Sequence, residues 1–329
     1  MPLKKKKILI TGAGGFIGSH LVEELVALGN EVTALVHYNS FNSWGNLELI
    51  ERDVLKNTSV VSGNIEDPFC VQKAVKGKEV VFHLAALIGI PYSYDAPLNY
   101  VRTNVEGTVN VMDACLKCGV EKVVHTSTSE VYGTALYTPI DEKHPLQGQS
   151  PYSASKIGAD KIAESYHLSF GLPVATMRPF NAFGPRQSAR ALISTIISQA
   201  LKGDIVKLGS LDTVRDMNYV QNTVYGFIKT AEQPASAGEV INIGSGKAYA
   251  IREIAETIFR IIGKHVRIVQ ETERIRPEKS EVMRLLCDNG KAKKLLGWEE
   301  IVGFEDGLKK TVEWIEKNLS LFKTDIYNV

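Results

Sequence analysis

The chain has 329 residues, of which 44% are hydrophobic and 23% are charged, a composition typical of a globular protein. This length predicts about two domains, or one large domain with a smaller lobe. The formal net charge is only +1, so the chain lacks the basic excess of a protein that binds nucleic acid or an anionic membrane surface. We therefore expect neither a nucleic acid nor a membrane among its partners.

Short apolar runs alternate with helical patterns through the first half of the chain. The predicted strands are 7–11, 31–36, 59–65, 79–86, 122–129 and 173–178, and the predicted helices are 16–27, 69–75, 99–118 and 152–170. Apolar strands that alternate with helices are typical of a doubly wound sheet, in which every strand is buried on both faces. The expected fold class is α/β, a Rossmann-like doubly wound parallel sheet with a smaller α/β lobe at the C-terminal end.

The alternation becomes irregular after residue 178. Helical patterns cover 189–202, part of 214–231, 251–262, 289–296 and 304–318, and a further apolar strand is predicted at 239–243. We expect a dinucleotide-binding domain at 1–178, to which residues 214–247 return. The second lobe would then combine residues 179–213 with residues 248–329.

Cysteine and histidine usage argues against disulfides and metal ions. The four cysteines are too few and too scattered for a disulfide framework. Cys115 and Cys118 form a CxxC, but they fall inside the predicted helix 99–118, where packing is the expected role rather than zinc or redox chemistry. The seven histidines form no HxxxH or HxH pair, so no metal site is expected.

The N-terminal segment resembles a signal peptide only briefly. Four lysines at positions 4–7 precede a short apolar run that breaks at once into glycines. The longest apolar stretch, residues 80–91, contains His83 and is too short to cross a bilayer. The expected location is the cytoplasm.

A glycine-rich turn joins the first predicted strand to the first predicted helix. Gly12, Gly15 and Gly18 are spaced as GxxGxxG, and the GxGxxG of many dinucleotide sites is not met because Ile17 occupies its last position. Glycines permit a tight turn and a close approach to a ligand, and the N-terminus of the following helix attracts a pyrophosphate. This placement predicts a dinucleotide-binding turn that includes Phe16 and Ile17.

The end of the second predicted strand lacks the usual ribose ligand. NAD sites commonly carry Asp or Glu at this point, about 20 residues after the glycines. This chain has His37, Tyr38 and Asn39 there, with no arginine placed for a 2′-phosphate. Asn39 could reach a ribose hydroxyl or be an ordinary loop residue. We predict NAD as the cofactor, with NADP left open, and His37 and Asn39 as contacts.

A tyrosine and a lysine share one face of the predicted helix 152–170. Tyr152 and Lys156 are four residues apart, which brings a phenol and an ammonium side by side. A free tyrosine has a pKa of about 10, and each unit of depression corresponds to about 1.4 kcal/mol, which Lys156 and a cationic nicotinamide could supply. The pair predicts a base that works beside a nicotinamide, and both residues are expected to contact the cofactor.

Thr128 and Ser129 end the fifth predicted strand, and Glu130 follows it directly. Ligands of an open α/β sheet bind beyond the carboxyl ends of its strands, so these side chains should face the nicotinamide. A hydroxyl beside Tyr152 suits a redox step between an alcohol and a carbonyl, and a carboxylate could remove a proton from a carbon next to a new ketone. The alternative interpretation of Glu130 is a capping or surface carboxylate.

Further motifs extend this pattern along the chain. They are HLAA at 83–86, RPFN at 178–181, GPRQ at 184–187, RDMNYV at 215–220 and LGW at 296–298. With the residues above, they make nearly the whole chain resemble the extended short-chain dehydrogenase/reductases that modify nucleotide sugars. The Thr-Ser-Glu string is similar to the 4,6-dehydratases. Segments 38–44 and 145–152 resemble the bacterial N-acetylglucosamine nucleotide 4,6-dehydratases of the legionaminic acid pathway.

This resemblance implies a mechanism. Tyr152, with Thr128, would take the proton of the sugar O4 while hydride leaves C4 for the nicotinamide; Glu130 would remove the C5 proton; and water would leave C6 before hydride returns there. Ser129 stands where the thymidine-diphosphoglucose enzymes have Asp, so Ser129 and protonated Glu130 are both candidates to protonate the leaving hydroxyl. The alternatives are a UDP-glucuronate decarboxylase, a UDP-sugar 4-epimerase and a non-catalytic NAD(P)-binding regulator.

The resemblance also implies binding residues and an assembly. Further cofactor contacts are expected from Asn64, Ile65, Leu84, Ala85 and Ala86. The nucleotide-diphosphate sugar is expected to meet Ser93, Asn104, Asn181, Arg186, Arg215 and Arg276, with the second lobe as its binding lobe. Members of this family commonly dimerise through helices like those at 99–118 and 152–170, so a homodimer is expected.

Overall fold

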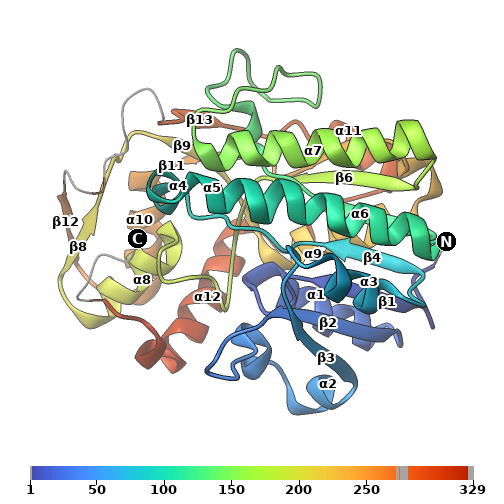
Figure 1. The fold of residues 1–329 in the computed structure, drawn as a ribbon. Helices are drawn as coiled ribbons and strands as arrows, with labels where there is room; N and C mark the ends of the chain where they lie inside the picture. Colours follow the sequence, from blue (N-terminus) through green and yellow to red (C-terminus); the bar gives the residue numbers. More distant parts are fainter. Residues whose placement is uncertain (1, 272–273, 275–280, 325–329) are drawn as a thin grey trace.

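A seven-stranded parallel sheet forms the centre of the computed structural model, which describes residues 2–271, 274 and 281–324 (Figure 1). Its strand order is β10-β6-β5-β4-β1-β2-β3, and every neighbouring pair is parallel. The strands are β1 (Lys7–Thr11), β2 (Glu31–His37), β3 (Thr58–Gly63), β4 (Val80–His83), β5 (Lys122–Thr126), β6 (Val174–Pro179) and β10 (Val240–Ile243). The predicted Rossmann-like α/β sheet is confirmed.

Helices cover both faces of this sheet because its strands send alternate apolar side chains into two cores. Ile8 and Ile10 lie in one core with residues of α1 and α9, whereas Leu9 lies in the other with residues of α3, α6 and α7. Figure 1 shows α6 and α7 running next to each other across their face of the sheet. These helices are α1 (Phe16–Ala27), α3 (Pro68–Val75), α6 (Gly107–Cys118), α7 (Pro151–Phe170) and α9 (Val220–Glu232).

A smaller lobe contains two short sheets. In one, β9 pairs with β7, β11 and β13; in the other, β8 pairs with β12. Helices α8, α10 and α12 pack against one another beside these sheets. The elements are β7 (Asn181–Phe183), α8 (Leu192–Lys202), β8 (Ile205–Leu208), β9 (Val214–Tyr219), β11 (Ala248–Ala250), α10 (Ile251–Ile262), β12 (Arg267–Gln270), β13 (Arg284–Leu285) and α12 (Phe304–Lys317).

Residues 214–247, which are expected to return to the dinucleotide-binding domain, divide between the large sheet and the smaller lobe. The first six of them form β9 in the smaller lobe, and not a helix, whereas α9 and β10 lie with the large sheet. Conversely, α11 (Gly290–Leu296) belongs to the expected second lobe in sequence but packs against β10 and α9 of the large sheet. The domain boundaries at 178 and 247 stay a prediction.

The single helix predicted at 99–118 is interrupted. It consists of α5 (Pro97–Tyr100), the π-helical turn η2 (Val101–Glu106) and α6. The remaining short helices are η1 (Gly45–Leu49), α2 (Arg52–Lys56), α4 (Ile90–Asp95), η3 (Ser129–Tyr132), η4 (Pro234–Ser236) and η7 (Leu319–Leu321). The π-helical turn and η3 both lie beside the pocket described next.

Candidate active site

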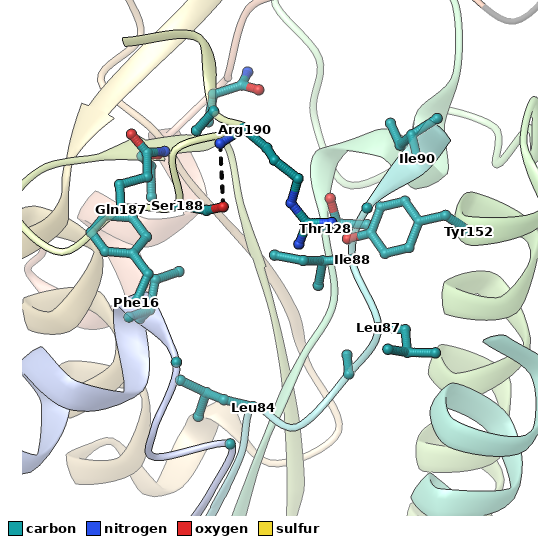
Figure 2. Close-up of a pocket in the computed structure, with 18 of the residues that line it drawn as sticks. Phe16, Leu84, Leu87, Ile88, Ile90, Thr128, Tyr152, Gln187, Ser188 and Arg190 are labelled. Carbon is teal, nitrogen blue, oxygen red and sulfur yellow. Dashed lines mark hydrogen bonds between the residues drawn. The ribbon is translucent and has the colours of Figure 1, made fainter. Parts of the chain in front are cut away.

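A pocket of about 1020 Å³ lies beyond the carboxyl ends of β1, β4 and β5. Its walls extend from the glycine turn before α1 to β8 and β9 of the smaller lobe. Figure 2 shows side chains from both parts of the molecule facing this space, with Phe16 and Leu84 on one side and Tyr152 on another. This is the edge of an open α/β sheet at which ligands bind.

The glycine turn leaves room for backbone only. A Cβ on Gly12 would lie 2.7 Å from the Ala85 nitrogen, and a Cβ on Gly18 would collide with the Gly12 carbonyl oxygen. Gly15 precedes α1 and supplies no capping side chain, so the first amide groups of the helix remain available to a ligand. All five predicted residues of this turn line the pocket: Gly12, Gly15, Phe16, Ile17 and Gly18. The turn therefore fits the pyrophosphate of a dinucleotide.

The next part of the pocket follows β2 and β3. His37, Asn39, Asn64 and Ile65 all line it, as do Leu84, Ala85 and Ala86 after β4. The Asn39 side chain forms hydrogen bonds within its own loop. Its Oδ1 accepts hydrogen bonds from the backbone of Phe41 and Ser43, both at 3.2 Å, and its Nδ2 donates to the Ser43 oxygen at 2.8 Å. In this conformation Asn39 shapes the wall rather than offering a free amide to a ribose.

The residues predicted to be catalytic meet at the centre of the pocket. Thr128, Ser129, Glu130, Tyr152 and Lys156 all line it. The first three follow β5, where Thr128 Oγ1 accepts the Glu130 amide at 3.2 Å and so caps η3. Helix α7 begins one residue before Tyr152, which places the phenol in its first turn.

A capping box fixes the start of α7. Ser150 Oγ accepts the Ser153 amide at 3.1 Å, and Ser153 Oγ accepts the Ser150 amide at 3.0 Å. Pro151 occupies the first helical position, where the missing amide hydrogen costs nothing. Tyr152 lies between these two serines, so the cap determines where its side chain leaves the helix.

Burial shifts the pKa of both Tyr152 and Lys156. Burial raises the pKa of Tyr152 well above its usual range, while the hydrogen bond with the Thr128 hydroxyl opposes this shift. Burial lowers the pKa of Lys156 to about 8. Lys156 Nζ donates to the Thr126 carbonyl oxygen at 2.7 Å. Tyr152 therefore needs additional positive charge before it can act as a base near neutral pH.

Asn104 and Ser93 lie behind the pocket wall rather than on it. Asn104, in the π-helical turn, accepts the Leu87 amide at 2.8 Å and donates to the Leu87 oxygen at 3.0 Å and Ser155 Oγ at 2.9 Å. Ser93 is buried and donates to the Ile90 oxygen at 2.6 Å. Neither lines the pocket, so both support the 87–90 segment in this conformation.

The predicted diphosphate ligands separate into two groups. Arg215 and Asn181 line the pocket, and Arg215 forms an ion pair at 3.1 Å with Glu281, which also lines it. Arg186 does not line the pocket: its buried guanidinium is paired with Glu23 of α1. The ion pair with Glu23, rather than a position on the exposed surface, accounts for the absence of Arg186 from the pocket lining. Arg276 lies outside the described residues.

Several pocket residues were not anticipated from the sequence. Leu87, Ile88 and Ile90 form an apolar stretch of the wall, and Ile88 is 64% exposed. Arg190 also lines the pocket, and a Cβ on Gly89 would be 3.4 Å from its Nη1. Figure 2 shows Arg190 extending from the loop of Gln187 and Ser188 toward the side of the pocket that holds Thr128 and Tyr152. No spacing in the sequence marked these residues.

Comparison with known proteins identifies the family. A family model described as GDP-mannose 4,6 dehydratase matches residues 9–311. The chain belongs to this family. It is thereby a member of the NAD-dependent nucleotide-sugar epimerases and dehydratases, as its motifs suggested.

Relatives within the family carry different activities. The chain is 33% identical to a UDP-N-acetyl-alpha-D-glucosaminuronate decarboxylase of Bacillus cytotoxicus, over 95% of this chain and 98% of the other. It is 35% identical to a UDP-glucose 4-epimerase of Mycolicibacterium smegmatis, over 94% and 98%. A dTDP-glucose 4,6-dehydratase double mutant from Streptomyces venezuelae, solved with NAD bound, superposes with a TM-score of 0.86 at 31% identity, over 96% and 99%. Family membership alone therefore leaves the reaction to be argued from the site.

Within the described ranges, no group of three or more His, Cys, Asp or Glu side chains is arranged to hold a metal ion. Over the same residues, no helix combines the length and apolar character needed to cross a membrane.

Proposed function

We propose that this protein is an NAD-dependent nucleotide-sugar 4,6-dehydratase that acts on an N-acetylglucosamine nucleotide. The observation that carries the proposal is the position of Glu130 in the same pocket wall as Thr128 and Tyr152. A 4-epimerase needs acid–base chemistry only at the sugar O4, whereas dehydration also needs a base for the C5 proton and an acid for the C6 hydroxyl. Glu130 is the carboxylate available for that additional work.

The cofactor would be held mainly by backbone. The glycine turn and the start of α1 would receive the pyrophosphate, and His37, Asn64 and Ile65 would flank the adenosine half. The segment 84–86 would lie along the nicotinamide half, with Tyr152 and Lys156 beyond it. Bound NAD supplies a reversible hydride acceptor, taking hydride from C4 and returning it to C6.

The chain's own residues would move the protons. Tyr152, hydrogen-bonded with Thr128, would take the O4 proton as the C4–H bond breaks. The resulting ketone acidifies the C5–H bond, and Glu130 would take that proton. The C6–O bond then breaks as Ser129 or the newly protonated Glu130 gives a proton to the departing hydroxyl, so that one water leaves. When hydride returns to C6, C5 takes up a proton and O4 stays a ketone oxygen, so the product is a 4-keto-6-deoxy sugar. The proton that Tyr152 took from O4 balances the one that C5 receives.

The diphosphate would lie toward the smaller lobe. Arg215 offers a planar fork that suits two phosphate oxygens, and Asn181 lines the pocket beside it. Glu281 neutralises Arg215 in the ligand-free conformation. A diphosphate would take over part of this role, because it brings negative charge to the same guanidinium.

The apolar wall supports an acylated amino sugar. A 2-acetamido group carries a methyl group, which gains by contact with exposed apolar surface such as that of Ile88. Leu87 and Ile90 extend this surface, and all three line the pocket that contains Tyr152. An N-acetylglucosamine nucleotide would use this wall better than a glucose nucleotide would.

Arg190 favours a second candidate, a UDP-glucuronate decarboxylase. Such an enzyme needs a cation near the sugar carboxylate, and Arg190 is a cation that extends into the pocket on the Tyr152 side (Figure 2). A relative is named as a decarboxylase of an N-acetylated hexuronate nucleotide. Decarboxylation needs only one proton transfer at C5, to the enolate left when carbon dioxide departs, whereas dehydration uses Glu130 as base at C5 and as candidate acid for the C6 hydroxyl, so we rank decarboxylation second.

We further propose a cytoplasmic homodimer. NAD and nucleotide sugars are cytoplasmic metabolites, which supports that location. Four large side chains on α5, η2 and α7 are at least half exposed: Leu98, Val101, Leu168 and Phe170. Exposed apolar side chains on neighbouring helices support a self-association surface. Leu168→Glu should therefore halve the mass that light scattering measures in solution, and an unchanged mass would contradict this surface.

The reaction can be assigned by incubating the purified protein with NAD and N-acetylglucosamine linked to different nucleoside diphosphates. Mass spectrometry should detect the loss of one water. Loss of carbon dioxide from a glucuronate nucleotide would instead identify the decarboxylase, and isomerisation without a mass change would identify an epimerase. Tyr152→Phe is the control for background chemistry. If none of the sugars changes while NAD still binds, the catalytic proposal is wrong.

A further inference from the structure

A buried carboxylate lies one helical turn beyond Lys156. Asp160 of α7 has only 4% of its side chain exposed. It accepts hydrogen bonds from Ser127 Oγ at 2.7 Å, from Arg178 at 2.9 and 3.2 Å, and from His125 Nε2 at 3.2 Å. A carboxylate this well satisfied can stay ionised without access to water.

Asp160 pairs with a buried cation of β6, Arg178, and lies one helical turn from a second buried cation on α7, Lys156. The Arg178 guanidinium, 5% exposed, binds Asp160 and also donates to the Tyr132 hydroxyl at 3.1 Å. The Lys156 side chain is buried as well and is held at the Thr126 carbonyl oxygen. Both cations interact electrostatically with the Asp160 carboxylate.

The other titratable neighbours do not supply negative charge to Lys156. His83 of β4 and His125 of β5 are fully buried, and burial lowers the pKa of each, so both are neutral near pH 7. Glu130 of η3 acts on the other side of the pair, where its charge raises the pKa of Tyr152. Among the residues that the structure describes, Asp160 is the group whose charge raises the pKa of Lys156.

We propose that Asp160 is a positioning residue whose charge keeps Lys156 in the ammonium form beside Tyr152. Removing it would leave Lys156 and Arg178 as two buried cations without the carboxylate that they share. A neutral Lys156 could no longer favour the tyrosinate, and the proton of the sugar O4 would have no acceptor. The inference rests on the proposed role of Tyr152 but not on whether dehydration, decarboxylation or epimerisation follows.

Stability of the charged state supports this role. Burial opposes ionisation of Asp160, but the hydrogen bond from His125 and the charge of Arg178 outweigh it and lower the pKa of Asp160 to about 2. Asp160 therefore remains an anion over the range in which Lys156 titrates, near pH 8. Lys156 loses its proton as the pH rises through its pKa, so removing Asp160 should move this loss to a lower pH.

The direct test titrates Lys156 itself, without substrate or turnover. Nuclear magnetic resonance of isotope-labelled lysine, with the Lys156 signal assigned by Lys156→Arg, should give a midpoint near 8 in the parent protein. In Asp160→Asn the midpoint should fall by about one unit, a tenfold loss of proton affinity. Ser127→Ala is the matched control, since it deletes one hydrogen bond to Asp160 and leaves the charge. An unchanged midpoint in folded Asp160→Asn overturns the proposal.

A second measurement separates positioning from structure. The falling limb of the kcat profile at alkaline pH should shift to lower pH in Asp160→Asn, with KM unchanged, because Asp160 does not itself line the pocket. Ser127 does line it, and the Ser127→Ala control measures the effect of losing its hydrogen bond with Asp160. If Asp160→Asn does not fold, Asp160→Asn combined with Arg178→Gln removes both charges and should still lower the Lys156 midpoint. Lower activity with the alkaline limb at the same pH as in the parent protein would mean that Asp160 has only a structural role. If no sugar nucleotide is turned over, the proposed function fails, and the lysine titration still decides the role of Asp160.

Discussion

The two ends of the pocket are built in different ways. At the glycine turn, the wall is backbone that approaches other backbone, with Gly12 against Ala85 and Gly14 against the Trp44 oxygen. At the other end, the wall includes charged side chains from the smaller lobe, such as Arg215 paired with Glu281. The first end is complementary to a ligand because of its shape, and the second because of charges that can exchange partners. At the centre of the pocket, Tyr152 and Glu130 would act through proton transfer, and not through shape or exchangeable ion pairs.

The largest effect is expected at this centre. Tyr152→Phe keeps the ring and removes the group that takes the O4 proton, so the first hydride transfer should fall by about 10³-fold. The absorbance of reduced nicotinamide in a single turnover measures this step. Tyr166→Phe, the same change on the same helix but outside the pocket lining, is the control. Normal cofactor reduction by the Tyr152 variant would remove the proposed base from the mechanism.

Glu130→Gln should separate oxidation from dehydration. The amide keeps the size of the side chain but cannot take the C5 proton, so water loss should fall by about 10²-fold. Oxidation at C4 should continue, and reduced cofactor should accumulate on the protein. Mass spectrometry and nicotinamide absorbance measure the two steps separately. Dehydration at the parent rate would contradict the role of Glu130 and leave the alternative of a capping carboxylate.

Gly12→Ala tests whether shape governs the cofactor end. The residue has a φ of +71°, and its new Cβ would press on the Ala85 backbone, so NAD affinity should fall by roughly 100-fold, about 2–3 kcal/mol. Gly29→Ala is the matched control, because its φ is +80° but nothing lies within 4 Å of the added Cβ. Calorimetric titration with NAD compares the two. Equal affinities would mean that steric fit at Gly12 does not control binding.

The smallest effects are expected at the charged end of the pocket, where two substitutions should change KM in opposite directions. Arg215→Met removes a charged ligand of the diphosphate and should raise KM about tenfold or more. Glu281→Gln removes the competing anion and should lower KM by about threefold at low salt. Steady-state kinetics at two ionic strengths measures both. If both variants raise KM, the ion pair holds the pocket together instead of exchanging with substrate.

The same contrast explains what could be predicted from the sequence. The cofactor end was predictable because its signal is local: a strand, three glycines and a helix follow one another within 21 residues, 7–27. The catalytic residues were predictable because Tyr152 and Lys156 share a helix, and residues 128–130 follow a strand of recognisable composition. In each case neighbours in sequence are neighbours in space.

The charged end was less predictable because its partners are distant in sequence. Arg186 and Arg190 lie four residues apart and have the same chemistry, yet Arg186 pairs with Glu23 of α1 while Arg190 lines the pocket. Strand β9 looked partly helical because its identity depends on pairing with β7, β11 and β13. The interruption of the helix predicted at 99–118 similarly brings Asn104 to Leu87, a contact that no periodicity reveals.

Asn104 has a consequence for how this enzyme family could change its substrates. It binds both polar groups of the Leu87 backbone and the Ser155 hydroxyl of α7, and so links the main chain of the apolar wall to the catalytic helix. The exposed side chain at 88 can then be exchanged while Asn104 keeps the wall in place, whereas Ile90 packs in one cluster with Tyr152. Substitutions in the exposed part of the wall could therefore change which sugar is accepted while Tyr152 keeps its position for proton transfer.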